Sequence, residues 1–151
     1  MEQIFTQERL INIIIIFFIT GFWDIVLRYM SEGYIKFLGI ENMKWVTTLK
    51  DYFKYHTVLG AALIAAFVGA IAYVLIIYAF EKLNITNVVY KLLTVFLISS
   101  LIGIPMRYTG LFPILNKYYY EPLGFVYSFI TDGMSGVIVA ITLFFLQLFI
   151  K

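Results

Sequence analysis

The sequence predicts an all-α integral membrane protein: a four-transmembrane-helix bundle with an interfacial amphipathic helix between spans one and two. Of 151 residues, 62% are hydrophobic and 13% are charged, whereas an average soluble domain has about 25% charged residues. The mean hydropathy is +0.92. Four apolar stretches reach or approach the roughly 20 residues that a helix needs to cross a bilayer. We therefore expect a single membrane domain, residues 1–151, with spans at about 10–30, 57–80, 88–104 and 126–150.

The first predicted span, residues 10–30, is expected to stay as an anchor. A signal peptide would begin with basic residues and end at a small-residue cleavage site, whereas Glu2, Glu8 and Arg9 precede this apolar run. Its isoleucine-rich start would suit a strand in water. A lone strand in lipid would leave its backbone unpaired, so a helix is predicted.

The connection at residues 31–56 contains apolar residues at helical spacing from Asn42 onwards, with lysines on the other side. This pattern is typical of an amphipathic helix that lies in the headgroup region. Alternatively, the same helix extends the second span into water. Both interpretations place Lys50 and Lys54 near the membrane surface.

The second span, residues 57–80, has no ionisable side chain and holds seven of the eight alanines. Small residues recur every four positions, which lets a neighbouring helix backbone come close in lipid. We expect this span to be the packing centre, through Gly60, Ala61, Ala65 and Gly69 and the parallel stripe Ala62, Ala66 and Ala70.

The third span, residues 88–104, should end or kink at Pro105, and the aromatic loop 105–125 follows. The last apolar run, 126–150, is interrupted by polar and glycine residues at 131–136. Two alternatives are open. Either one tilted helix carries the interruption, or a new helix starts at Thr131 with this residue as N-cap and Asp132 in its first turn.

Four spans would bring several ionisable residues to one membrane face and leave almost none at the other. We call them the predicted polar cluster: Asp24, Arg28, His56, Arg107 and Asp132. Ionisable groups in a membrane need partners and often mark function. Asp24 and Arg28 form either a structural ion pair or part of a polar path, and Arg107 either pairs with Asp132 or binds a lipid phosphate.

Aromatic and basic residues also favour this face. Interfacial aromatic residues are predicted at Trp23, Trp45, Tyr118, Tyr119 and Tyr120. Seven Lys and Arg lie beside the two long connections and four lie beside the termini and the short turn. The positive-inside rule therefore places the connections in the cytoplasm and both termini on the non-cytoplasmic side.

Several classes of function are disfavoured by composition. A net charge of +2 is too small and too scattered for nucleic-acid binding. Absent cysteines exclude disulfides and thiolate metal sites, and a single histidine cannot form an imidazole cage. We expect no metal, no cofactor and no catalytic residue.

Three functions are compatible with the chain. The first is a structural or interaction subunit that anchors or docks a protein layer at one membrane face, with the lipid bilayer, other membrane or capsid-type proteins and a possible second copy as partners. The second is an oligomeric channel or transporter subunit. The third is a lipid-modifying enzyme with His56 and an aspartate as acid and base.

The stretch 104–113 (IPMRYTGLFP), the tyrosines at 118–120 and the stretch 131–136 (TDGMSG) carry a resemblance. Here the chain is similar to uncharacterised multi-span membrane proteins of large cytoplasmic DNA viruses. The resemblance covers about the last third of the chain and implies a place in the inner membrane of a virion, under the capsid. It implies no catalytic residues.

Overall fold

The computed structural model describes residues 6–43, 46–47, 58–108 and 122–149, apart from some side chains near helix ends. The described part is helical and contains no strand. Its helices are α1 (Gln7–Phe37), α3 (Val58–Lys82), α4 (Val88–Tyr108) and α6 (Pro122–Phe149). The prediction of an all-α protein is confirmed.

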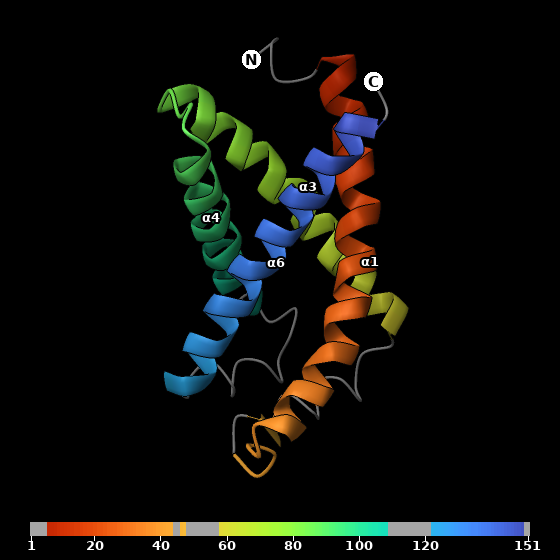
Figure 1. Ribbon diagram of the computed structural model, residues 1–151, viewed down its shortest axis with the longest axis vertical. Coiled ribbons are helices and arrows are strands. Elements are labelled where there is room, and N and C mark those ends of the chain that lie inside the picture. Colours follow the sequence, from red (N-terminus) through yellow and green to blue (C-terminus); the bar gives the residue numbers. More distant parts are fainter. Residues whose placement is uncertain (1–5, 44–45, 48–57, 109–121, 150–151) are drawn as a thin grey trace.

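Neighbouring helices run in opposite directions (Figure 1). The start of α1, the end of α6 and the α3–α4 turn lie at one end, which we call the termini end. The opposite end, where α1 and α4 finish and α3 and α6 begin, is the connection end. The most extensive contacts join α1 to α3 and α4 to α6, and smaller contacts join α1 to α6 and α3 to α4.

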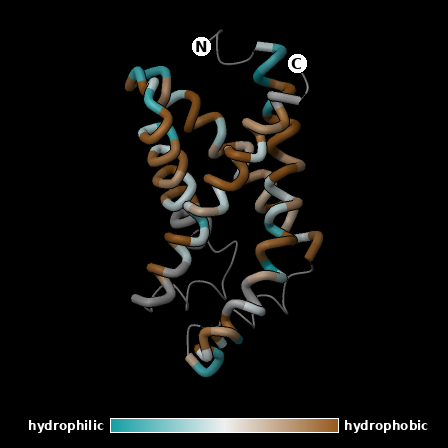
Figure 2. The backbone as a smooth tube through the Cα atoms, viewed as in Figure 1, coloured by the Kyte–Doolittle hydropathy of each residue, from teal (hydrophilic) through white to brown (hydrophobic). Residues whose placement is uncertain are grey.

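The helices bury small side chains and expose large apolar ones. Alanines 61, 62, 66 and 72 of α3 are buried. Large apolar residues recur every four positions on the outer faces, in Leu10, Ile14, Phe18 and Phe22 of α1, Leu59, Leu63, Phe67, Ile71 and Leu75 of α3, and Val89, Leu93, Leu97 and Leu101 of α4. Soluble proteins rarely expose such continuous apolar surface, and it suits contact with lipid. Figure 2 shows hydrophobic colour along the helices and hydrophilic colour at several of their ends.

Three helices are long and apolar enough to cross a membrane: Gln7–Phe37, Val58–Lys82 and Ser128–Leu146. The apolar part of α4 that the structure describes, Val88–Ile102, is shorter. The chain therefore has the composition and helix lengths of a membrane protein, with three candidate spans.

Local hydrogen bonds explain where two of these helices begin. The Arg9 backbone N–H donates to Thr6 Oγ1 (3.4 Å) at the start of α1, and the Val89 N–H donates to Asn87 Oδ1 (2.8 Å) at the start of α4. Both are N-caps that satisfy an otherwise unpaired donor. Between α3 and α4, Asn84 adopts a φ of 49°, a left-handed conformation typical of helix C-termini. The turn between α3 and α4 is thus closed by backbone hydrogen bonds, such as that from the Ile85 N–H to the Phe80 carbonyl oxygen (3.0 Å), and by the Asn87 side chain.

Three boundaries differ from the expectations. Helix α1 continues to Phe37, into the predicted connection, and α4 continues past Pro105 to Tyr108. Helix α6 is continuous through 131–136, so the prediction of a new helix capped by Thr131 is wrong and the single-helix alternative holds.

The Thr131 and Ser135 hydroxyls donate to the carbonyls of Ser128 (3.1 Å) and Thr131 (2.8 Å), respectively. These polar side chains therefore stay within the helix by bonding to its preceding turn. The predicted amphipathic helix lies mostly outside the described residues.

Candidate functional site

The predicted polar cluster is described only in part. Asp24 and Arg28 lie one turn apart on α1, and Asp132 lies in the interior of α6. His56 lies outside the described residues, as does the side chain of Arg107, whose backbone is in the last turn of α4. Pairing between Arg107 and Asp132 therefore stays a prediction.

Asp24 and Arg28 belong to a polar row on α1 that also includes Thr20, at successive four-residue intervals. Arg28 is only 8% exposed, and its positive charge interacts with the Asp24 carboxylate. Among the described residues, Thr20 Oγ1 and Asp24 Oδ2 are buried and accept or donate no hydrogen bond. The row is thus a buried polar element within an apolar helix, a costly arrangement that persists when the charges compensate each other.

Thr20 also marks the α1–α3 crossing, which we define as Thr20 and Gly21 of α1 with Ala62, Ala66 and Gly69 of α3. A β-carbon built at Gly21 would lie 3.3 Å from the Ala62 carbonyl oxygen and 3.6 Å from Ala66 Cβ. One built at Gly69 would lie 2.7 Å from Thr20 Cγ2. The two helices approach this closely because neither glycine has a side chain.

The small residues predicted for packing fall in different environments. Ala61 is buried, Gly60 and Ala65 are half-buried, and Gly69 meets Thr20. The parallel stripe supplies the alanines at the crossing, Ala62 and Ala66.

A second glycine contact, which sequence reasoning missed, forms the α4–α6 crossing: Phe96, Ser99 and Ser100 against Gly133 and Gly136. A β-carbon built at Gly133 would lie 2.6 Å from Phe96 Cδ2, and one built at Gly136 would lie 2.6 Å from Ser99 Cβ. The Ser100 hydroxyl, fully buried, donates to the Phe129 carbonyl oxygen (2.7 Å). The sequence contains a signal for this contact: small residues occur in both helices, as Ser99 and Ser100 in α4 and as Gly133 and Gly136 in α6.

Asp132 is half-buried beside this crossing. Ser128, which is buried, donates to Asp132 Oδ2 across one turn of α6 (3.3 Å). Asp132 therefore has a hydrogen-bond donor within its own helix rather than a role at a helix start.

Trp23, predicted as an interfacial aromatic residue, is half-buried and faces α6. Its Nε1 donates to Thr142 Oγ1 (3.0 Å), and that hydroxyl donates to the Ile138 carbonyl oxygen (2.8 Å). The indole thereby joins α1 to α6, the less extensive of the contacts that α1 makes. Trp45 and the three tyrosines at 118–120 lie outside the described residues.

We expect Trp23→Phe to lower the free energy of unfolding by about 0.5 to 1.5 kcal/mol, because an aromatic ring, although a smaller one, still fills the position while the interhelical hydrogen bond is lost. Thr142→Val should give a similar loss. Unfolding in detergent micelles with increasing denaturant measures both. Thr94→Val is the control, since the Thr94 hydroxyl donates to the Tyr90 carbonyl within its own helix (2.8 Å). A larger loss for Thr94→Val than for Trp23→Phe would contradict the assignment.

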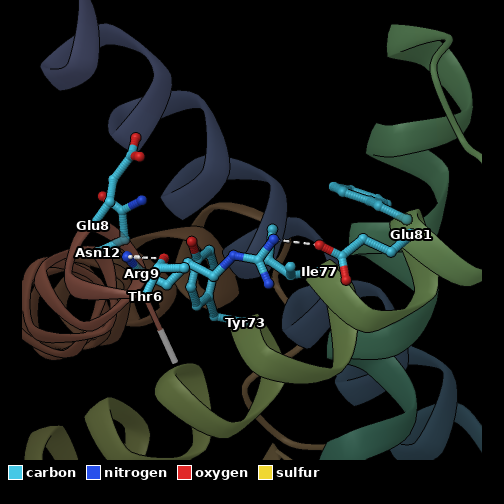
Figure 3. A pocket seen from close by; sticks show the side chains of 8 residues that line it. Thr6, Glu8, Arg9, Asn12, Tyr73, Ile77 and Glu81 are labelled. Carbon is cyan, nitrogen blue, oxygen red and sulfur yellow. Dashed lines mark hydrogen bonds and ion pairs between the residues drawn. The ribbon is translucent and has the colours of Figure 1, made fainter. Parts of the chain in front are cut away.

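The termini end carries charges too, contrary to the expectation that this face has almost none. Arg9 Nη2 of α1 forms an ion pair with Glu81 Oε1 of α3. The ammonium groups of Lys82 and Lys91 lie 5.8 and 5.7 Å from the ring centroids of Tyr78 and Phe80. An open pocket of about 430 Å³ lies beside the ion pair (Figure 3).

The polar side chains of Trp23 and Ser100 form hydrogen bonds that connect one helix to another. No group of three or more histidine, cysteine, aspartate or glutamate residues that could hold a metal ion occurs among the described residues. Comparisons with protein families, curated proteins and solved structures find no match to the chain.

Proposed function

We propose that the protein is a structural subunit that crosses a membrane four times and docks a protein layer at its connection end. The observation that carries the proposal is the length and surface of α1. Its 31 residues correspond to about 46 Å of helix, whereas the hydrocarbon core of a bilayer is about 30 Å thick. The helix therefore has about ten residues to present beyond the core.

The end of α1 projects past the ends of its neighbours in Figure 1. It exposes Tyr29 (65%), Met30 (62%) and Phe37 (86%), close to the exposed Lys36. Aromatic residues and methionine are enriched in protein interfaces, and a few such residues usually provide most of the binding energy. Tyr29 and Met30 lie at the end of the predicted span 10–30, and Phe37 lies seven residues beyond it. A docking role gives Phe37 a partner that lipid tails, at that distance from the core, do not supply.

The fourth crossing and the orientation are parts of the same proposal. Helix α4 would complete an even number of spans, so that both termini share one side. The excess of Lys and Arg beside the connections supports a cytoplasmic connection end. If the chain belongs to a virus with an inner membrane, the docked layer would be its capsid.

The test is purification of the full-length protein in mild detergent, followed by quantification of any protein bound in fixed proportion. We expect Tyr29→Ala and Phe37→Ala each to weaken partner binding about thirty-fold, the ratio that the loss of about 2 kcal/mol at an interface hot spot produces. Phe18→Ala is the matched control, because the exposure of Phe18 (70%) lies between those of Tyr29 and Phe37 but Phe18 belongs to the apolar stripe of Leu10, Ile14, Phe18 and Phe22. It should leave partner binding unchanged.

Two results would contradict the proposal. One is a protein that carries no stoichiometric partner and forms a homo-oligomer that conducts ions in liposomes. The other is a partner whose binding depends on Phe18 as much as on Phe37, since docking would then not use the projecting end of α1.

A further inference from the structure

The exposed end of α1 has an open position among its large side chains. Gly33 is exposed, and a β-carbon built there meets nothing within 4 Å. The nearest surface neighbours of a helical residue lie three and four positions before and after it. For Gly33 these neighbours are all long and all exposed: Tyr29, Met30, Lys36 and Phe37. We call these five residues the Gly33 notch, because three large apolar side chains and one ammonium group surround a residue that has no side chain.

The backbone that carries the Gly33 notch is fixed by the way α1 ends. Gly39 has a φ of 64°, and its N–H donates to the Lys36 carbonyl oxygen (3.2 Å). The Ile40 N–H donates to the Ile35 carbonyl oxygen (3.3 Å), which completes a Schellman motif. Ile35 lies two positions from Gly33, hence on the other side of the helix, and is only 2% exposed. A partner therefore meets a surface that needs little ordering before it binds.

The α1–α3 crossing shows how far out Gly33 lies. Gly21 lies against Ala62 and Ala66 of the antiparallel helix α3 (Figure 1). The first residue of α3, Val58, precedes these alanines by four and eight positions, whereas Gly33 follows Gly21 by twelve. At 1.5 Å per residue, Gly33 lies about 6 to 12 Å farther out than the start of the α3 span. Lipid tails end near the start of that span, so they do not cover the outer part of the notch.

We propose, on the basis of the docking function proposed above, that the Gly33 notch receives one large apolar side chain of the docked protein, next to a carboxylate that pairs with Lys36. Tyr29 and Phe37 lie one turn to either side of Gly33, so a leucine-sized or phenylalanine-sized side chain fits between them as a knob fits a hole between packed helices. Lys36 is exposed and carries the positive charge of the notch. An acidic residue beside the inserted side chain supplies the complementary charge.

The test is Gly33→Leu in the full-length protein, purified in mild detergent, with affinity measured for the protein that the wild type binds in fixed proportion. Leucine fills the notch, so binding should weaken about ten-fold or more, the effect of overfilling a packed site. Gly33→Ala should weaken it less, because a methyl group fills only part of the space. Lys36→Glu should also weaken binding about ten-fold through charge repulsion, whereas Lys36→Arg should retain it. Ile14→Phe, which adds bulk on the apolar stripe of α1, is the matched control and should change binding less than about two-fold.

Gly33→Leu should fold as well as the wild type, because the position is open and leucine favours a helix over glycine; thermal unfolding checks this. Wild-type binding by Gly33→Leu, together with weak binding by Phe37→Ala, would overturn the notch and leave the docking function standing. An equal loss in Ile14→Phe would also overturn it. So would loss of a homo-oligomer in Gly33→Leu, since the occupant would then be a second copy of the chain. A wild type without any stoichiometric partner would overturn both proposals.

Discussion

Replacing Asp24 by leucine should lower the free energy of unfolding by about 3 to 5 kcal/mol, the range for breaking a buried charge pair by removal of one partner. Arg28 is 8% exposed and interacts electrostatically with this carboxylate one turn away. In the variant, the guanidinium would keep its charge inside an apolar helix without the Asp24 charge that offsets it. The measurement is unfolding in detergent micelles with increasing denaturant.

The double variant Asp24→Leu/Arg28→Met is the decisive comparison. Removing both charges avoids an uncompensated ion, so the double variant should be clearly more stable than Asp24→Leu alone. Asp132→Asn should cost much less, because the amide oxygen can still accept from Ser128. A double variant that loses the sum of two large single losses would show that Asp24 and Arg28 do not act as a pair.

Gly136→Val should be the next most damaging change, with a loss of about 2 to 3 kcal/mol, near the upper end for an overpacked core. Even a β-carbon at this position would lie 2.6 Å from Ser99 Cβ. That atom is fixed to the α4 backbone, so a rotamer change of Ser99 cannot make room. The helices would have to separate, and the buried bond from Ser100 to the Phe129 carbonyl would lengthen. Thermal unfolding in detergent would detect the loss.

Gly33→Ala is the matched control for Gly136→Val. Gly33 lies within α1, and a β-carbon built there meets nothing within 4 Å. Alanine favours a helix over glycine by about 1 kcal/mol, so this variant should be as stable as wild type or more so. If Gly33→Ala and Gly136→Val destabilise equally, the α4–α6 crossing is looser than described.

Helix positions were predictable from the sequence wherever a long apolar run has abrupt polar ends. The second span was expected at residues 57–80 and the helix is Val58–Lys82, because no competing signal lies inside it. The end of α1 was not predictable in this way. Residues 31–37 mix polar and apolar residues without a helix stop such as proline, so the helix continues after the apolar run has ended.

The candidate site was less predictable, because side-chain pairing across helices depends on helix rotation. The row of Asp24 and Arg28 follows from four-residue spacing within one helix. Contacts such as Trp23 with Thr142, or Arg9 with Glu81, join residues 119 and 72 positions apart. No local pattern specifies which of several apolar faces turns toward which neighbour. In the sequence, Gly133 and Gly136 resemble an interruption of a helix, whereas in the structure they allow close approach of α4.

The contact pattern among the helices also bears on the order of assembly. The larger interfaces join α1 with α3, the N-terminal hairpin, and α4 with α6, the C-terminal hairpin, whereas α3 and α4, which are separated by the shortest connection, contact each other less. During synthesis the N-terminal hairpin can close its Gly21 and Gly69 contacts before the C-terminal hairpin emerges. The seam between the two hairpins, which includes the contact of Trp23 with Thr142, would then form last and open first under thermal stress.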